Sequence, residues 1–307
     1  MHKSPAPAGR FAEACSALAP LYGPAEAKAI ARLVMEEKYG LSMTDILLGR
    51  EPAEWDPAIL SRLQAGEPVQ HVLGRTTFCG LRVKTDARAL IPRPETEGLV
   101  SLVSELCPAP AAILDVCTGS GCIALALKHR FPAAHVEAWD VSPEALALAR
   151  ENFALHNLNI TTRQLNLLNE HEWPAVRFSP LEGEDSRRAE GGIISPPEAE
   201  DVRSPLAVIV SNPPYVLLSE RAAIQPHVLC HEPHLALFVP DDDPLLFYRP
   251  LARLARQRLQ AGGALIVECN TDQTDAVARI FASYGLLAPA VLDDCFGRPR
   301  FVAATQP

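Results

Sequence analysis

The chain has 307 residues, which allows one large domain or two smaller ones, and its hydrophobic content of 48% is enough for a sizeable core. Its 37 acidic and 28 basic residues give a formal net charge of −9, which argues against a large nucleic-acid-binding surface, because such a surface is basic. The sequence has no apolar run of about 18 residues, so we expect no membrane span, and residues 1–5 lack the apolar stretch of a signal peptide.

The first 66 residues are predicted to form a small helical domain. A helical stretch begins at Pro24 and stops at Gly40, with apolar residues along one face. Ser42 followed by Asp45 resembles a capping box, and Asp56-Pro57 resembles an N-cap with proline at the first helical position.

Residues 67–88 are predicted to form a β-hairpin linker. Apolar side chains alternate through Val69, His71 and Leu73, and the pattern continues through the segment 78–83, which suggests short strands. Residues 90–97, Leu-Ile-Pro-Arg-Pro-Glu-Thr-Glu, then form a stiff loop that opens a helix through residue 106.

Strands and helices alternate from residue 111 onward. Predicted strands cover residues 112–116, 136–139, 207–210, 264–268 and 287–292, and predicted helices cover 122–130, 143–156, 244–260 and 272–284. This alternation favours an α/β fold with a parallel sheet and helices on both faces. Residues 300–305 follow the last strand closely, so we expect an antiparallel hairpin to close the sheet.

Residues 179–204 interrupt this alternation. The segment is rich in proline, glutamate, serine, glycine and arginine, and we interpret it as a mobile surface insertion. A partner-binding arm is the alternative interpretation.

The sequence Asp115-Val116-Cys117-Thr118-Gly119-Ser120-Gly121 joins a predicted strand to a predicted helix through a glycine turn. The glycines let the backbone approach a ligand closely, and the start of the helix offers free N–H groups. Asp115 would repel a pyrophosphate but attract the ammonium group of an amino acid, and Asp140 ends the next strand, where it can accept both hydroxyls of a ribose. Together these residues predict a site for S-adenosylmethionine, although both aspartates are also common as strand-end caps.

The sequence Asn212-Pro213-Pro214-Tyr215 follows another buried strand. The Asn212 side-chain carbonyl and the Pro213 backbone carbonyl can accept hydrogen bonds from a planar NH2 group, and Tyr215 offers a flat face for stacking. Ligands of open parallel sheets lie beyond the carboxyl ends of the strands, so the glycine loop, Asp140 and Asn212 are expected to meet in one crevice. A stiff strand-to-loop turn is the alternative interpretation of the tetrapeptide alone.

These motifs resemble the class I methyltransferases that act on planar amino or amide nitrogen. The residues that narrow the resemblance to the peptide-chain release factor glutamine N5-methyltransferases, the PrmC/HemK family, are Gln70-His71-Val72-Leu73-Gly74, Phe78, Gly80, the 90–97 loop, Glu232-Pro233, Ala236-Leu237, Tyr248-Arg249, Gly262-Gly263 and Glu268. The resemblance covers most of the chain, from about residue 22 to residue 303.

The resemblance implies a class I SAM-dependent methyltransferase domain over residues 89–307, Rossmann-like with a seven-stranded, mostly parallel sheet. It implies a five-helix-like N-terminal domain that recognises the substrate, which is the glutamine of the Gly-Gly-Gln loop in class I release factors. By the family pattern, 117–121, Asp140 and Val141 hold the cofactor, together with Asn166 and Leu167 near the adenine, and 212–215 hold the glutamine. The roles of Arg93 and Glu97 stay open between a loop-pinning ion pair and a place in the pocket wall.

Two other functions compete with this interpretation. A nucleic-acid methyltransferase acting on N6-adenine or N4-cytosine uses the same tetrapeptide, but the acidic composition disfavours it. A non-catalytic cofactor-binding partner of the translation machinery is disfavoured by the intact 212–215 sequence.

The eight cysteines are scattered without a Cys-x-x-Cys pair, which fits reduced thiols in a cytoplasmic protein.

A possible metal site is suggested by the spacing of His227, Cys230, His231 and His234. Pro226 and Pro233 break any long helix there, so we favour a polar loop near the active site and expect no metal. We expect a monomer that acts on a protein substrate, with no nucleic-acid or membrane partner.

Overall fold

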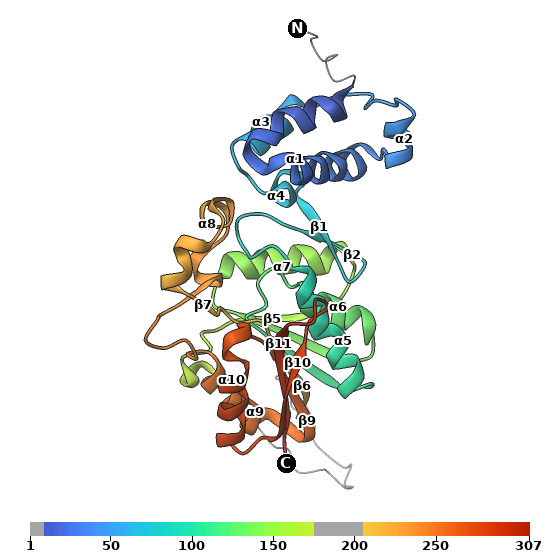
Figure 1. Ribbon diagram of the computed structural model, residues 1–307. Helices are drawn as coiled ribbons and strands as arrows, with labels where there is room; N and C mark the ends of the chain where they lie inside the picture. Colours follow the sequence, from blue (N-terminus) through green and yellow to red (C-terminus); the bar gives the residue numbers. More distant parts are fainter. Residues whose placement is uncertain (1–8, 175–204) are drawn as a thin grey trace, which may run out of the picture.

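The computed structural model describes residues 9–174 and 205–307 (Figure 1). The N-terminal helices lie together at one end of the molecule, and the remaining helices surround a central sheet. The predicted insertion at 179–204 lies outside the described residues.

The N-terminal helices are α1 (Arg10–Tyr39), α2 (Met43–Leu47), α3 (Pro57–Gln64) and α4 (Val69–Leu73). Gly23 interrupts α1 with φ 78° and ψ 161°, and Pro24 starts the second segment, so residues 10–66 contain four helical segments, and α4 follows them in the predicted linker. These helices share a hydrophobic cluster made of Leu18, Ala27, Ile30, Val34, Ile59, Leu63 and Val72.

The predicted helix ends in this region are confirmed. Gly40 adopts the left-handed conformation with φ 66° and ends α1, where a side chain would be strained. Ser42 and Asp45 form the capping box of α2, and the Asp56 carboxylate accepts a hydrogen bond of 3.0 Å from the Ala58 N–H at the start of α3.

The connecting segment contains a hairpin, but its first half was predicted wrongly. Strands β1 (Arg75–Phe78) and β2 (Leu81–Lys84) pair antiparallel. The alternating residues 69–73 form helix α4 instead of a strand, with Pro68 before it and Gly74 in the left-handed conformation after it. His71 and Val72 are both buried, so adjacent side chains enter the interior, as in a short helix and not as in a two-sided strand.

The central sheet has seven strands in the order β10-β11-β9-β6-β3-β4-β5 among the described residues, and this confirms the predicted fold class. The strands are β3 (Ala112–Val116), β4 (His135–Asp140), β5 (Thr161–Gln164), β6 (Leu206–Ser211), β9 (Leu259–Glu268), β10 (Leu287–Asp293) and β11 (Pro299–Thr305). β11 runs antiparallel to both of its neighbours, so the predicted C-terminal hairpin is confirmed. The edge strand β5 was not among the predicted strands, because its residues Thr-Thr-Arg-Gln carry no apolar pattern.

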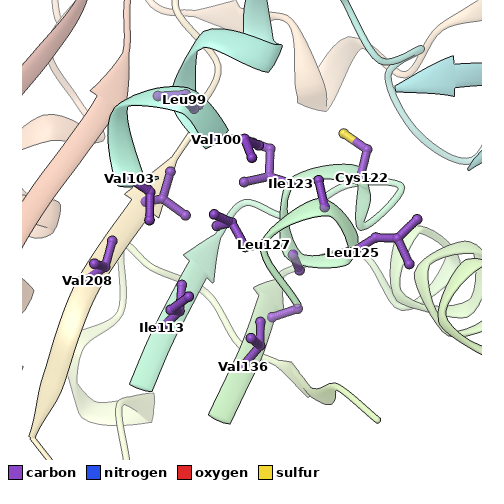
Figure 2. Packing of buried hydrophobic residues seen from close by; sticks show 14 of the residues in the cluster. Leu99, Val100, Val103, Ile113, Cys122, Ile123, Leu125, Leu127, Val136 and Val208 are labelled. Atoms are coloured by element: carbon purple, nitrogen blue, oxygen red, sulfur yellow. The ribbon is translucent and has the colours of Figure 1, made fainter. Parts of the chain in front are cut away.

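Helices cover both faces of the sheet. On one face, α5 (Glu97–Leu106) and α6 (Cys122–Arg130) pack through Leu99, Val103 and Leu127 against β3, β4 and β6, with α7 (Pro143–Leu155) beside them (Figure 2). On the other face, α9 (Tyr248–Arg258) packs against β9, α10 (Thr274–Ser283) packs against β10 and β11, and both helices share a hydrophobic cluster with the alternate side chains of β3 and β6.

Helix α9 is shorter than the predicted 244–260. Residues 244–247 form turns, and Leu259 begins β9, where it pairs with Leu206 of β6. The apolar periodicity of a helix and the start of a buried strand are indistinguishable over these few residues.

The short elements are the 3-10 helices η1 (Pro94–Thr96), η2 (Glu170–Glu172), η3 (Leu218–Ala223), η4 (His234–Ala236) and η5 (Thr271–Gln273), the helix α8 (Pro226–His231), and the parallel strand pair β7 (Val216–Leu217) and β8 (Phe238–Val239). None of the helices in the described ranges is long and apolar enough to cross a membrane.

Gly121 joins the glycine turn to α6 at a place where no side chain fits. Its φ is +79°, and an added Cβ would lie 2.7 Å from a ring atom of Phe153 and 2.9 Å from the Ala149 Cβ, both on α7. Close contact between α6 and α7 therefore requires glycine for space as well as for backbone conformation.

We expect Gly121→Ala to lower the free energy of unfolding by about 1–3 kcal/mol more than Gly297→Ala, measured by urea denaturation. Gly297 is the matched control, because its φ of +72° carries the same backbone strain but nothing lies within 4 Å of the added Cβ. Equal losses in the two variants would contradict a role for the Phe153 contact.

Candidate active site

One crevice lies beyond the carboxyl ends of the parallel strands. Residues 117–120 follow β3, Asp140 ends β4, and Asn212 follows β6, and all of them line the crevice. Val141, Asn166, Leu167 and Pro214 line it as well, whereas Asp115, Gly121, Pro213 and Tyr215 do not. The crevice is partly open to solvent.

The glycine turn has positive φ at three alternate residues, which are Cys117 (61°), Gly119 (54°) and Gly121 (79°). The Thr118 N–H donates to the carbonyl of Trp139 at 2.9 Å, so the turn is held against the end of β4. Cys117 adopts a conformation that side-chain-bearing residues rarely occupy, and such strain is typical of ligand-binding turns.

Asp115 lies beneath this turn and is fully buried. Its Oδ2 accepts hydrogen bonds from the Thr118 hydroxyl at 2.6 Å and from the Ala124 N–H at 3.1 Å, whereas its Oδ1 has no partner in the described part of the chain. Burial raises the pKa of Asp115 to about 7, against the lowering effect of these two hydrogen bonds. A positive ligand group that reached this carboxyl group would favour its charged form.

Asp140 holds the turn from the other side. Its Oδ2 accepts from the Gly119 N–H at 2.8 Å, and its Oδ1 accepts from the Ser142 N–H at 2.9 Å. Burial raises the pKa of Asp140. Each carboxylate oxygen keeps a second lone pair, so Asp140 can still accept the two hydroxyls of a ribose.

Asn166 and Leu167 form the far wall of the crevice. The Asn166 Oδ1 accepts a hydrogen bond of 3.0 Å from the Leu168 N–H, which fixes the side chain in a local turn. The Leu167 side chain is buried in the hydrophobic cluster behind the sheet. The Asn166 amide is therefore held in place with one lone pair of its oxygen already used.

The tetrapeptide 212–215 is fixed at both of its ends. The Ser211 hydroxyl before it donates to the Val116 carbonyl at 2.7 Å, which ties β6 to β3. The Asn212 Nδ2 donates to the Thr96 hydroxyl at 3.2 Å, and the Tyr215 hydroxyl donates to the Glu268 Oε1 at 2.9 Å. No role was predicted for Thr96 or Glu268, although both lie in segments that carry the family resemblance.

Arg93 both pins the 90–97 loop through an ion pair and lines the crevice. Its ion-pair partner is Glu232 and not Glu97. Its Nη2 donates to the Glu232 Oε1 at 2.7 Å, and the Ile91 N–H donates to the Glu232 Oε2 at 3.0 Å, so this buried carboxylate pins the 90–97 loop. Glu97 accepts instead from the Cys79 N–H at 2.8 Å and so ties α5 to the hairpin.

The histidine-rich segment forms a short helix, α8, and not the predicted loop. His227, Cys230 and His231 face a second cavity that Tyr22 and Glu26 of α1 also line. Within residues 9–174 and 205–307, no group of three His, Cys, Asp or Glu side chains is placed to hold a metal ion.

A family model described as a methyltransferase domain matches residues 113–179. The chain is 34% identical to a release factor glutamine methyltransferase of Bacteroides thetaiotaomicron, over 93% of this chain and 95% of that protein. A release factor glutamine methyltransferase of Deinococcus radiodurans is 37% identical, over 90% of each chain. The chain belongs to the release factor glutamine methyltransferase family.

A solved structure, the hMettl16 catalytic domain in complex with the MAT2A 3'UTR hairpin 6, is similar to this chain with a TM-score of 0.50 and 11% identity, over 91% of this chain and 81% of that one. At this identity the likeness shows the shared methyltransferase fold alone.

The cofactor of a methyltransferase of this family is S-adenosylmethionine, and the crevice fits it. Asp140 retains lone pairs for ribose hydroxyls. The buried Oδ1 of Asp115 has no hydrogen-bond partner among the described residues and lies beneath the same turn. A positively charged ligand group near it would be stabilised electrostatically. Gly119 has only the Ala89 Cβ near the position of an added side chain, at 3.9 Å, so its backbone is open to close approach.

We expect the free energy of unfolding of the cofactor-free protein to fall as pH rises, because of the raised pKa of Asp115. Its folded pKa of about 7 lies above the ordinary value of 3.8, so the folded protein holds the proton more tightly and loses stability between these two pH values. The loss is at most about 1.4 kcal/mol per pH unit and is complete above the folded pKa.

The measurement is the free energy of unfolding of the wild type and Asp115→Asn at pH 5 and pH 8. The asparagine does not titrate, so the stability of the wild type relative to the variant should fall between these pH values. The exposed Asp293→Asn serves as the control and should change in parallel with the wild type. A constant difference between wild type and Asp115→Asn would contradict the raised pKa.

Proposed function

We propose that this protein transfers the methyl group of S-adenosylmethionine to the side-chain amide nitrogen, N5, of the glutamine in the Gly-Gly-Gln loop of class I peptide-chain release factors. The observation that supports it is the fixed Asn212 amide, which is held through its Nδ2 by the buried Thr96 hydroxyl and lines the same crevice as the glycine turn and Asp140. Membership of the release factor glutamine methyltransferase family supports the choice of glutamine among planar nitrogen substrates.

An amide nitrogen is a poor nucleophile because its lone pair is delocalised. In the proposed mechanism the Asn212 Oδ1 and the Pro213 carbonyl accept the two N–H bonds of the glutamine amide. These two acceptors fix the plane of the amide and place negative partial charge beside a nitrogen that becomes more positive during attack. Tyr215 does not line the crevice in this structure, so packing of its ring on the amide plane requires the glutamine to reach past Pro214, and the Tyr215 hydroxyl is anchored on Glu268.

The bound cofactor supplies an activated methyl group on a positively charged sulfur. Residues 117–121, Asp140 and Val141 would hold it, with Asn166 and Leu167 at the adenine end. The proton leaves the product nitrogen after attack, to water or to a nearby carbonyl, so positioning and electrostatics carry most of the rate enhancement.

We further propose that the helical unit 1–66 is a domain that recognises the release factor, joined by the linker 67–88 to the catalytic domain 89–307. The hydrophobic cluster of α1 and α3 is separate from the clusters of the sheet and supports a separate N-terminal unit, and Val72 of α4, in the linker, packs into the same cluster. All eight cysteines are free thiols, which supports a cytoplasmic location, because thiols stay reduced there. We also propose that the protein is a monomer and acts on a protein and not on nucleic acid, in line with its net charge of −9.

The proposal is tested by incubating the purified protein with methyl-labelled S-adenosylmethionine and a class I release factor, and separately with DNA and RNA. We expect label on the release factor and none after the glutamine of its Gly-Gly-Gln loop is replaced. Label on nucleic acid would overturn the proposal in favour of a nucleic-acid methyltransferase. Cofactor binding without transfer to any substrate would favour a non-catalytic role.

We expect Asn212→Ala to lower kcat on the order of 100- to 1,000-fold, as in the loss of one transition-state hydrogen-bonding group. Cofactor affinity, measured by calorimetry, should stay near that of the wild type, because Asn212 is assigned to the substrate amide. The matched comparison is Asp140→Ala. This variant should lose cofactor affinity, because Asp140 is assigned to the cofactor. Unchanged turnover in Asn212→Ala would remove Asn212 from the mechanism.

A further inference from the structure

Asn152 is a fully buried polar residue on α7 that the mechanism described so far does not use. Its Oδ1 accepts a hydrogen bond of 2.7 Å from the Lys84 N–H, and its Nδ2 donates to the Lys84 carbonyl at 3.2 Å. The same Nδ2 donates to the Ser120 carbonyl of the glycine turn at 2.9 Å. One side chain therefore joins the linker strand β2 to a turn that lines the crevice.

The pairing of Asn152 with Lys84 takes the place of a neighbouring strand. Among the described residues β2 pairs only with β1, so one of its edges has no strand beside it. An edge leaves backbone N–H and C=O groups unpaired, which is costly where they are buried. A side-chain amide carries the same donor and acceptor as a peptide unit, so Asn152 satisfies both backbone groups of Lys84. His156, four residues further along the chain, bonds to the Arg82 carbonyl on the same edge at 2.6 Å.

The contact with Ser120 fixes one peptide unit of the glycine turn. The carbonyl of this unit accepts from Asn152, and its N–H, which belongs to Gly121, donates to the Thr118 carbonyl at 2.9 Å. The unit is held on both sides, so it cannot rotate without breaking a hydrogen bond. Its orientation accompanies the left-handed conformation of Gly121, with φ of +79°, where the turn enters α6.

Asparagine meets all of these demands at position 152. Its amide uses one acceptor and both N–H donors, and the three partners fix which end of the amide points where. An ionised aspartate has the same shape but can only accept, so it would face two carbonyl oxygens without a proton between them. Leucine has a similar size but offers neither a donor nor an acceptor.

The linker strand is also attached to the N-terminal helices. Thr85 follows β2, and its hydroxyl donates to the Gln70 carbonyl of α4 at 2.9 Å. Arg62 of α3 donates to the His71 carbonyl, also on α4, at 3.2 Å. Direct hydrogen bonds therefore lead from the N-terminal unit through the linker to the glycine turn, and Asn152 makes the last of these contacts.

We propose that Asn152 is a positioning residue that holds the glycine turn in its cofactor-binding conformation and couples cofactor binding to the attachment of the linker strand. A cofactor bound at the turn favours the arrangement in which Ser120 bonds to Asn152. The same arrangement holds Lys84, and coupling between two sites is reciprocal. The inference rests on cofactor binding at the turn, which is part of the proposed function, and not on the choice of methyl acceptor.

The first test measures cofactor affinity by calorimetry with the full-length protein. We expect Asn152→Asp to raise the Kd for S-adenosylmethionine roughly 10- to 100-fold, by analogy with residues that hold metal ligands in place. At saturating cofactor, kcat on the release factor should stay near that of the wild type, because Asn152 does not line the crevice.

The matched control is His156→Ala, which also removes a contact between the end of α7 and β2. In the part of the chain that the structure describes, the His156 ring bonds to the strand and not to the turn. The Kd of this variant should therefore stay near that of the wild type.

A second measurement needs neither a variant nor a methyl acceptor. The exchange rate of the Lys84 N–H in the wild type, followed by NMR, reports on the contact directly, because Asn152 is the acceptor. We expect saturating S-adenosylmethionine to slow this exchange about 10-fold. The Gly40 N–H, which donates to the Glu36 carbonyl in α1, is the internal reference and should not change.

A wild-type Kd in Asn152→Asp would overturn the inference, and so would an equal rise in Kd in His156→Ala. If Asn152→Asp does not fold, the exchange measurement decides. An unchanged rate at Lys84, or equal slowing at Lys84 and Gly40, would contradict the coupling. Absence of transfer to the release factor would count against the proposed function alone, because neither the Kd nor the exchange rate involves the acceptor.

Discussion

The parallel pairing of β3 with β4 on one side and β6 on the other is the constraint on which the rest of the site depends. Ile113 pairs with Val136 and with Val208, so the three strands end at one edge. The glycine turn, Asp140 and Asn212 each follow one of these strands, and the crevice exists because the strands share a direction. Leu99, Val103 and Leu127 pack over the same strands (Figure 2).

Two buried carboxyl groups, Asp115 and Glu268, lie near this edge of the sheet. Asp115 lies beneath the glycine turn, and Glu268 lies behind the tetrapeptide, each with one oxygen lacking a partner of standard geometry. Neither arrangement favours folding by itself, because burial of a carboxylate costs free energy. Asp115 holds the glycine turn through the Thr118 hydroxyl and the Ala124 N–H, and Glu268 holds the end of the tetrapeptide through the Tyr215 hydroxyl. The fold thus accepts an unfavourable electrostatic arrangement where binding and catalysis require it.

Much of this architecture could be predicted from the sequence, because local signals and the fold agree. The glycine turn, the capping box of Ser42 and Asp45, and helix α6 follow from local chemistry and were predicted at the right residues. Strand β5 and helix α4 were not, since Thr161–Gln164 has no apolar pattern and residues 69–73 fit two periodicities. The contacts of Asn212 with Thr96, of Tyr215 with Glu268 and of Arg93 with Glu232 join residues 53 to 139 positions apart. Such pairs depend on the tertiary structure, and no local pattern reveals them.

The central claim is that a planar side-chain amide binds beside Asn212 at the wall of the crevice, with the Asn212 Oδ1 and the carbonyl of the buried Pro213 as its two acceptors. The most direct measurement is a crystal structure of the protein with the demethylated cofactor and a glutamine-containing peptide from the Gly-Gly-Gln loop. We predict that the glutamine NH2 group lies within hydrogen-bonding distance of the Asn212 Oδ1 and the Pro213 carbonyl. A glutamine bound elsewhere, or one whose carbonyl faces Asn212, would contradict the account.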